Sequence, residues 1–282
     1  MARFAGRVAM ITGASSGIGA ALARELAGEG AAVALLARRA DTIEALAGEL
    51  RGAGARALAV PCDVTRDGEL ERAVAAAVAE FGRLDIVVAN AGFGVAGRFP
   101  DLALDDYRRQ FETNVFGVLR TASAALAELT RTRGTLALVG SVAGYLPAPG
   151  SSPYAMSKAA VRSFAGALRG ELAPRGVAVV LLTPGYVDSE IRRVDNRGVL
   201  HPGAPEPVPA WLRMSAPAAA RRMVRAIGRR RREAVITVHG KVAVLLARHT
   251  PRLLAWMVER ARVSRPEPGR RGRGGGETSP PT

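Results

Sequence analysis

The chain has few of the residues that form disulfides or bind metals. Among its 282 residues there are one cysteine and three histidines. A single cysteine, Cys62, excludes an intrachain disulfide, and its place at the end of a predicted buried strand favours packing over a reactive thiol. His201, His239 and His249 do not stand at the spacing of metal ligands, so we predict no metal site.

The sequence also lacks a charged and then apolar leader of the signal-peptide type, so we expect a cytoplasmic protein. The most apolar segment near the C-terminus, residues 241–258, is interrupted by Pro251 and by charges. It is therefore too short to span a bilayer.

Lysine is scarce although positive charge is not. Of 40 basic residues only Lys158 and Lys241 are lysines, and Lys158 stands four residues after Tyr154. That spacing is one helical turn, so both side chains project from the same face of a helix. A fixed ammonium favours the phenolate, which would lower the pKa of Tyr154 from about 10 and allow proton exchange with an alcohol or carbonyl oxygen. Because Y-x-x-x-K also arises by chance, its meaning depends on the rest of the chain.

A glycine-rich turn follows the first predicted strand and opens the first predicted helix. Gly13 permits a tight turn, Gly17 lets the backbone approach a pyrophosphate, and Gly19 lets the helix pack closely on the strand. The phosphates would lie at the positive end of the helix. The spacing is G-x-x-x-G-x-G, and strand, turn and helix together form the context of a dinucleotide-binding site.

Apolar runs of strand length alternate with longer amphipathic stretches. The runs consist mainly of Val, Leu, Ile and Ala, as expected when helices cover both faces of a sheet. This alternation predicts one α/β domain with a doubly wound, Rossmann-type, parallel seven-stranded sheet, followed by a basic and apolar C-terminal extension. The predicted strands are 8–12, 32–37, 57–61, 85–89, 135–140, 177–183 and 234–238. The predicted helices are 17–28, 41–53, 67–81, 104–131, 154–173 and 217–230.

Several short motifs occur together in one order. They are Thr12-Gly13-x-x-x-Gly17-x-Gly19, Asn90-Ala91-Gly92, Asn114, Ser141, Tyr154-x-x-x-Lys158 and Pro184-Gly185. Over roughly residues 5–240 this pattern resembles the short-chain dehydrogenase/reductase family. The resemblance implies an NADP-binding catalytic domain at 1–240 with a mobile substrate lid at about 186–215. An amphipathic extension at 241–263 and a disordered tail at 264–282 complete the predicted organisation.

The resemblance also implies the catalytic roles. Tyr154 would be the proton donor in reduction and the base in oxidation, and Lys158 would lower its pKa and hold the nicotinamide ribose. Ser141, at the end of a predicted strand, would hydrogen-bond the substrate oxygen. Asn114 would order a water that relays protons to the lysine. The cofactor would supply the hydride.

The implied cofactor contacts follow the ends of the predicted strands. They are Gly13, Ser15, Ser16, Gly17, Ile18, Gly19, Arg38, Asp63, Val64, Asn90, Ala91, Gly92, Tyr154, Lys158, Pro184, Gly185, Val187 and Ser189. Ala37 stands where NAD-preferring proteins place a carboxylate, and Arg38 and Arg39 follow it. Arginine binds a 2′-phosphate with a charge-assisted fork, so we predict NADP(H), mainly through Arg38 with Arg39 as a second contact. The alternative is an ordinary solvated loop in an arginine-rich chain.

The predicted substrate mouth is apolar. Phe93, Val95, Tyr145, Leu146 and Pro147 would line it, and the prolines of residues 190–215 fit a mobile lid. We therefore expect a hydrophobic ketone, aldehyde or secondary alcohol as substrate. Lipid-like, steroid-like and polyketide substrates are not distinguished.

Most of the net charge lies at the C-terminus. Residues 221–282 carry 16 Lys and Arg against 4 Asp and Glu, out of a net charge of +15 for the chain. A solvated surface, contact of residues 241–263 with an anionic membrane surface or with the substrate mouth near the lid and, last, contact with nucleic acid are the alternatives. Two function classes follow: an NADP-dependent oxidoreductase, and a cofactor-binding interaction protein that docks on anionic surfaces. A homo-oligomer formed through helices 104–131 and 154–173 is what the resemblance implies.

Overall fold

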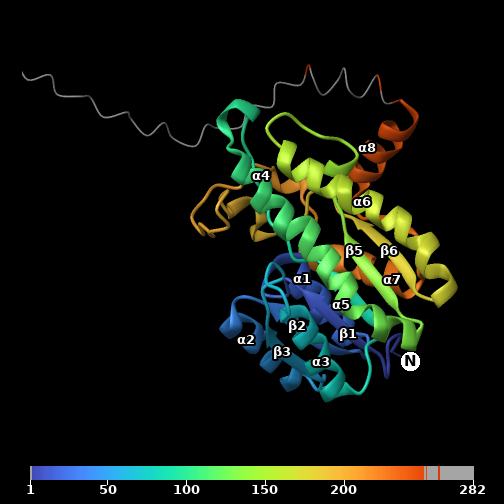
Figure 1. The fold of residues 1–282 in the computed structure, drawn as a ribbon. Coiled ribbons are helices and arrows are strands. Elements are labelled where there is room, and N and C mark those ends of the chain that lie inside the picture. The colour runs from blue at the N-terminus through green and yellow to red at the C-terminus, as the bar shows by residue number, and fades with distance from the viewer. Residues whose placement is uncertain (1, 251, 253–259, 261–282) are drawn as a thin grey trace, which may run out of the picture.

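Seven parallel strands form one sheet in the order β3-β2-β1-β4-β5-β6-β7, with helices on both faces (Figure 1). The computed structural model describes residues 2–250, 252 and 260. The predicted doubly wound, Rossmann-type architecture is confirmed. The strands are β1 (Val8–Thr12), β2 (Ala32–Ala37), β3 (Ala57–Pro61), β4 (Ile86–Ala89), β5 (Thr135–Val139), β6 (Ala178–Thr183) and β7 (Glu233–Val235).

Successive residues of each central strand enter two different apolar layers. In β1, Ala9 and Ile11 lie in one layer, whereas Val8 and Met10 lie in the other. Both layers are buried because side chains alternate across a strand and helices cover both faces. The helices of the first layer are α1 (Gly17–Gly28), α2 (Ala40–Gly52) and α7 (Ala216–Gly228). Those of the second layer are α3 (Glu69–Phe81), α5 (Gly117–Thr132) and α6 (Ser152–Leu172).

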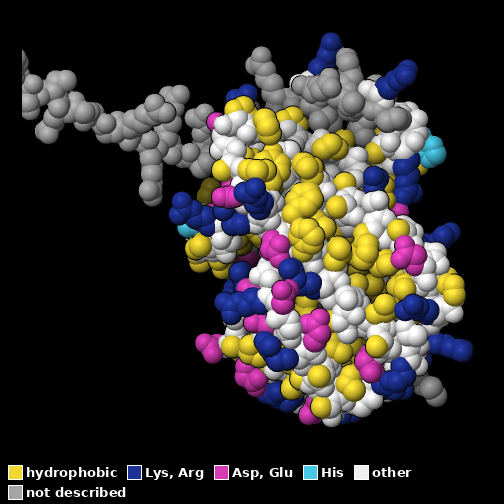
Figure 2. Space-filling model, viewed as in Figure 1, with side chains coloured by type: hydrophobic (Ala, Val, Ile, Leu, Met, Phe, Trp, Pro, Cys, Tyr) yellow, Lys and Arg dark blue, Asp and Glu magenta, His cyan; other side chains and the backbone are white. Residues whose placement is uncertain are grey.

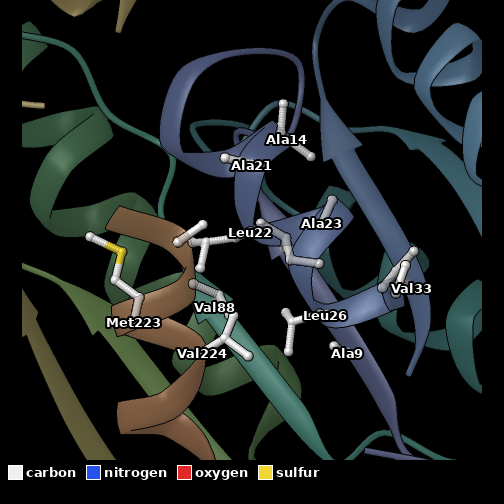
Figure 3. Packing of buried hydrophobic residues seen from close by; sticks show 14 of the residues in the cluster. Ala9, Ala14, Ala21, Leu22, Ala23, Leu26, Val33, Val88, Met223 and Val224 are labelled. Atoms are coloured by element: carbon white, nitrogen blue, oxygen red, sulfur yellow. The ribbon is translucent and has the colours of Figure 1, made fainter. Parts of the chain in front are cut away.

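Helices α1 and α7 pack against each other although they are far apart in the sequence. Figure 3 shows Val224 of α7 beside Leu22 and Leu26 of α1, with Val88 of β4 close by. All four side chains are fully buried. The contact fixes the start of α1, and therefore the glycine turn, relative to the end of the lid that leads into α7.

The order of the strands places a crevice at the carboxyl end of the sheet. Strand β1 pairs with β2 on one side and with β4 on the other, so successive connections run in opposite directions from β1. Ligands of doubly wound sheets bind at such a switch point. Here the segments that begin at Gly13 and Asn90 leave β1 and β4 side by side.

Three elements differ from the predicted ones. The helix expected at 104–131 is α4 (Leu104–Phe111), a π-helical turn (Glu112–Phe116) and α5. The last strand ends at Val235 rather than 238, because Thr237 accepts a hydrogen bond from the Gly240 amide (3.2 Å) and caps helix α8 (Val238–His249). The predicted extension thus begins inside α8. Its part after Thr250, apart from Arg252 and Arg260, and the predicted tail lie outside the described residues.

Cys62 is buried in the second apolar layer. Burial, together with the charges of Glu69 and Asp63, raises the pKa of its thiol to about 11. The thiol is therefore protonated at neutral pH, which agrees with a packing role. In the described part of the chain no helix has the length and apolarity needed to cross a membrane.

Candidate active site

The glycine turn and the segment after β4 are bound tightly to each other. Thr12 Oγ1 accepts hydrogen bonds from the amides of Asn90 and Ala91, both at 3.0 Å. The Asn90 side chain donates back to the Thr12 carbonyl (2.9 Å) and the Gly13 carbonyl (3.2 Å). Asn90 therefore shapes the crevice from within. Thr12 is a positioning residue that the sequence identified only as part of a motif.

Glycine is required in this turn for steric reasons. A Cβ on Gly19 would lie 2.1 Å from the Gly13 carbonyl oxygen, and one on Gly13 would lie 2.8 Å from the Ala91 Cα. Gly13 and Gly17 also have φ values of +68° and +53°, which favour glycine. Ser16, at the N-cap of α1, makes no side-chain cap. The first amides of α1 are therefore left for an anion, as a dinucleotide pyrophosphate requires.

The predicted adenine contacts follow β3. Asp63 Oδ1 accepts hydrogen bonds from the amide and the hydroxyl of Thr65, at 3.0 and 2.8 Å. Val64 is buried against Gly117, where an added Cβ would lie 2.7 Å from its Cγ2. The Val64 side chain is thus occupied by packing on α5, and its backbone is the part that could face a cofactor.

Ser141, Tyr154 and Lys158 meet at the carboxyl end of β5. Ser141 Oγ accepts a hydrogen bond from the Ala143 amide (3.1 Å), so its own hydroxyl proton stays available for donation. Lys158 is 4% exposed, and its Nζ donates to the Val139 carbonyl at 2.9 Å. The same Nζ lies 5.8 Å from the centre of the Tyr154 ring.

The expected lowering of the Tyr154 pKa is wrong for this structure. Burial raises the pKa of the phenol, and a hydrogen bond with Ser141 and the charge of Arg192 lower it by less. Burial also lowers the pKa of Lys158, to about 8. Desolvation therefore outweighs the two contacts that favour the phenolate of Tyr154, and it is the cause of the shift at Lys158. Arg192, a residue of the lid, was not predicted to act on Tyr154.

Two amide side chains hold the loop that follows Gly92. Asn114 Oδ1 accepts from the Phe93 amide (3.1 Å), and its Nδ2 donates to the Phe93 carbonyl (3.0 Å) and to Ser157 Oγ (3.2 Å). Gln110 accepts from the Val95 amide (2.6 Å) and donates to the Phe93 carbonyl (2.8 Å). Both amides are fully buried. The π-helical turn carries Asn114 to this position, and the water relay through it stays a prediction.

Gln110 was missed by the sequence analysis. The sequence does contain a feature that could have identified Gln110. It stands four residues before Asn114 and therefore lies on the same helix face. Val95 is 1% exposed, and its amide is held by Gln110. Its side chain therefore packs inside instead of lining the mouth, whereas Phe93 and Leu146 stay partly exposed and Pro147 is exposed.

Tyr145, predicted to line the mouth, is held through its hydroxyl group by β7 and α8. Its hydroxyl donates to Glu233 of β7 at 2.6 Å, and Arg248 of α8 donates to the same oxygen at 3.2 Å and to Glu233 at 2.5 Å. The Arg162 guanidinium lies 4.3 Å from the centre of the ring. The Tyr145 hydroxyl therefore fastens α8 to the sheet and is not free for a substrate.

The start of α8 lies under the turn that was predicted to meet the nicotinamide. A Cβ on Gly185 would lie 2.3 Å from Thr237 Oγ1 and 2.5 Å from His239 Nε2. His239 Nε2 accepts from the Tyr186 amide at 3.1 Å, and the two rings stack with centres 5.6 Å apart. Burial lowers the pKa of His239, which suits this acceptor role. His239 was not assigned a place in the site from the sequence, and of α8 only the part from Lys241 onward was expected to pack near the lid.

The lid contacts both walls of the crevice. Asn196 exchanges two hydrogen bonds with the backbone of Ala96, at 2.9 and 3.0 Å. Arg192 donates to Glu206 (2.6 Å) and to the Val187 carbonyl (3.0 Å). At the start of the lid, a Cβ on Gly17 would lie 3.0 Å from the Ser189 Cβ. The segment predicted as a lid thus contacts the loop after β4 on one side and the glycine turn on the other.

The two arginines after β2 have different surroundings. Arg38 is exposed. Arg39 donates to Ser15 Oγ at 3.0 Å and to Glu190 Oε2 of the lid at 3.2 Å. Arg39, predicted only as a second contact, thus touches the glycine turn directly, and the leading role of Arg38 stays a prediction. Two cavities of about 590 and 420 Å³ flank this region, and neither is lined by Ser141 or Tyr154.

A family model described as short chain dehydrogenase matches residues 7–199. The chain belongs to the short-chain dehydrogenase/reductase family. An uncharacterised oxidoreductase of Methylorubrum extorquens is 39% identical over 191 residues, which are 67% of this chain and 77% of that protein. The chain is accordingly an oxidoreductase of this family.

Two solved dehydrogenase structures have the same fold but hold different cofactors. The Burkholderia phymatum enzyme in complex with NAD is 26% identical, with a TM-score of 0.78 over 87% of this chain and 94% of that one. The Thermococcus sibiricus alcohol dehydrogenase complexed with 5-hydroxy-NADP is 32% identical, with a TM-score of 0.72 over 81% of this chain and 95% of that one. A nicotinamide cofactor fits the uncapped start of α1 and the glycines that leave room beside it.

Proposed function

We propose that the chain is an NADP(H)-dependent oxidoreductase that interconverts a hydrophobic ketone or aldehyde and its alcohol. The convergence of Ser141, Tyr154 and Lys158 at the carboxyl end of β5 supports this proposal most. The rival hypothesis of a cofactor-binding interaction protein gives no reason for a buried lysine beside a tyrosine that is hydrogen-bonded to a serine.

The chain's own residues hold the substrate oxygen and move its proton. When bound, the nicotinamide cofactor supplies or accepts the hydride. In reduction, Ser141 donates a hydrogen bond to the carbonyl oxygen, and the Tyr154 hydroxyl transfers its proton to that oxygen. In oxidation, Tyr154 takes the proton from the alcohol. A protonated Lys158 stabilises the phenolate left on Tyr154 after proton transfer, which offsets the raised pKa caused by burial.

The NADP(H) preference rests on the end of β2. Ala37 offers no carboxylate to the ribose hydroxyls and no repulsion to a 2′-phosphate. Exposed Arg38 and Arg39 provide guanidinium groups that bind such a phosphate. The hydrophobic substrate class rests on the partly exposed Phe93 and Leu146 at the mouth.

Replacing the proton donor tests the proposal. We expect Tyr154→Phe to abolish NADPH-dependent carbonyl reduction, because general acid catalysis contributes about 10²–10⁴-fold and no second donor adjoins Ser141 in the proposed mechanism. Loss of nicotinamide absorbance over a carbonyl panel measures the rate, and nicotinamide fluorescence checks that NADPH still binds. A variant with more than roughly a tenth of the wild-type rate would exclude this role of Tyr154.

Two partners belong to the same proposal. Exposed Val238, Val242 and Leu245 recur on one face of α8, and Lys241 lies exposed beside them. We propose that this face contacts an anionic lipid surface, because its charge complements such a surface and a hydrophobic substrate could be drawn from it. We also propose that the chain forms a homo-oligomer through α5 and α6.

A further inference from the structure

One arginine at the end of β2 contacts both the glycine turn and the lid. Arg39 Nη2 donates to Ser15 Oγ at 3.0 Å, and the Arg39 Nε lies 3.3 Å from the same oxygen. The same Nη2 lies 3.2 Å from Glu190 Oε2. Glu190 opens the first 3₁₀ turn of the lid, directly after Ser189, which packs on Gly17. The lid therefore places a carboxylate where the proposed 2′-phosphate would meet Arg39.

The contact is of a kind that a ligand can replace. Both side chains are substantially exposed, 45% for Arg39 and 39% for Glu190. An ion pair between exposed groups contributes little to stability. A phosphate monoester carries more negative charge than a carboxylate and can accept two parallel hydrogen bonds from a guanidinium. The phosphate should therefore displace Glu190 from Arg39. Because the Arg39–Glu190 ion pair must be broken first, the apparent affinity for the phosphate is lower than it would be without Glu190.

We infer that Glu190 is a specificity-determining residue that competes with the 2′-phosphate of the cofactor for Arg39. It weakens NADP(H) selectively, because NAD(H) has no group that must displace it. Binding of NADP(H) frees the first turn of the lid from the wall beside the glycine turn, whereas binding of NAD(H) leaves that turn attached. The inference rests on the proposed use of NADP(H), which it extends to a residue of the lid.

Binding measurements on matched variants test the inference. The full chain is compared with Glu190→Gln, which keeps the shape of the side chain and removes its charge. The control is Glu49→Gln, because Glu49 also forms an exposed ion pair, at 2.6 Å with Arg24, and lines the larger cavity beside Ser15. Dissociation constants for NADPH and NADH are obtained from nicotinamide fluorescence.

We expect Glu190→Gln to tighten NADPH by up to about fivefold, the upper limit for loss of an exposed ion pair, and to change NADH by a clearly smaller factor. Glu49→Gln should leave both constants unchanged. In an Arg39→Met background the effect of Glu190→Gln should vanish. Equal tightening of both cofactors, no change in either, or weaker NADPH binding would each overturn the competition.

The readout is separate from that of the proposed function. Since only binding is measured, a failure of the Tyr154 mechanism would leave these constants interpretable. If wild-type protein bound NADH more tightly than NADPH, the proposed preference would fail. The selective gain for NADPH in Glu190→Gln would then still establish Glu190 as a cause of that result.

Discussion

At the scale of single residues, burial decides how the reacting groups behave. Tyr154 and Lys158 both have pKa values displaced toward their neutral forms, upward for the phenol and to about 8 for the ammonium. The raised pKa keeps Tyr154 protonated over the neutral range and so ready to donate. Lys158 also gives its hydrogen bond to the Val139 carbonyl, which fixes its Nζ near Gly92 and Asn114.

The choice of cofactor is a second residue-scale question. We expect Ala37→Asp combined with Arg38→Leu to reverse the preference from NADPH to NADH. The phosphate loses a charge-assisted bond, at about 1.5–3 kcal/mol, so NADPH affinity should fall at least about tenfold, while the ribose hydroxyls gain an acceptor. Titrations with both cofactors measure the switch, and single variants Arg38→Leu and Arg39→Leu show which guanidinium contributes more. A wild-type protein that already prefers NADH would refute the interpretation of this strand end.

At the scale of elements, one buried carboxylate joins the amino ends of two strands. Asp85, 2% exposed, accepts from Arg7 (2.6 Å), from Arg83 (2.8 and 2.6 Å) and from the Val8 amide (3.0 Å). Burial raises the pKa of Asp85, but the hydrogen bonds from Arg83, Arg7 and the Val8 amide lower it by more, so the net pKa lies below its ordinary value. Asp85 thus stabilises the start of β1 far from the crevice.

Removing that charge should destabilise the fold without touching the site. We expect Asp85→Asn to lower the free energy of unfolding by about 1–3 kcal/mol at pH 7. The loss should stay near the lower end, because Arg7 and Arg83 are 46% and 41% exposed and water can solvate them. Urea titrations measure the change. Asp105→Asn, in an ion pair with both partners more than two-thirds exposed, is the control and should cost less than about 1 kcal/mol.

The pH dependence of this difference has a definite sign. Because the folded pKa of Asp85 is lowered, its contribution is fully present above the unfolded value of about 3.9 and is lost as the pH falls through the folded value. Wild type and Asp85→Asn should therefore converge in stability in acid. A difference that persists unchanged at low pH would show that the ionised carboxylate is not responsible.

Elements also show which features can be predicted from the sequence. The strands were predictable because Val8–Thr12 and the other strand segments are continuous apolar runs. Most helix ends were predictable because glycine or polar turns separate the helices from these runs. The π-helical turn at Asn114 was not, because it depends on bonds from Asn114 to Phe93, far away in the sequence. The ends of β7 and α8 likewise depend on the Thr237 cap. Among site residues, spacing predicted which would converge, whereas the roles of Gln110, His239 and Arg192 depend on tertiary contacts.

At the scale of the whole molecule, apolar side chains gather over α5 and α6 on the face seen in Figure 2. Phe116, Leu119 and Met156 are 48%, 37% and 51% exposed. Exposed apolar patches on folded proteins mark interaction surfaces. In the proposed homo-oligomer, a second copy of this chain covers the patch. We expect a mass of at least twice 29.4 kDa by light scattering, and a lower one for Phe116→Glu with Met156→Arg. A monomeric wild type would refute the proposal.

Membrane contact is tested by variants of α8 rather than by its removal. Truncation at Gly240 would remove most of α8, including Arg248, which is bonded to Glu233 of β7, so a loss of binding would be ambiguous. We expect Val242→Gln with Leu245→Gln to reduce sedimentation with anionic vesicles, and raised salt to reduce it for wild type. Leu104→Gln, 64% exposed on α4, serves as the control. Equal binding of wild type and the double variant, or no binding at low salt, would refute a role of this face.

The packing of α7 on α1 has a consequence for how the chain is made. About 190 residues separate the end of α1 from the start of α7. At about 5–20 residues per second, a ribosome needs about 10–40 s to add them. During that time α7 is not yet present to cover Leu22 and Leu26. The nascent chain therefore exposes an apolar helix face that can associate with other unfolded chains. Slower aggregation at low temperature, or a chaperone that covers this face, should raise the yield of folded protein more than any change near the crevice.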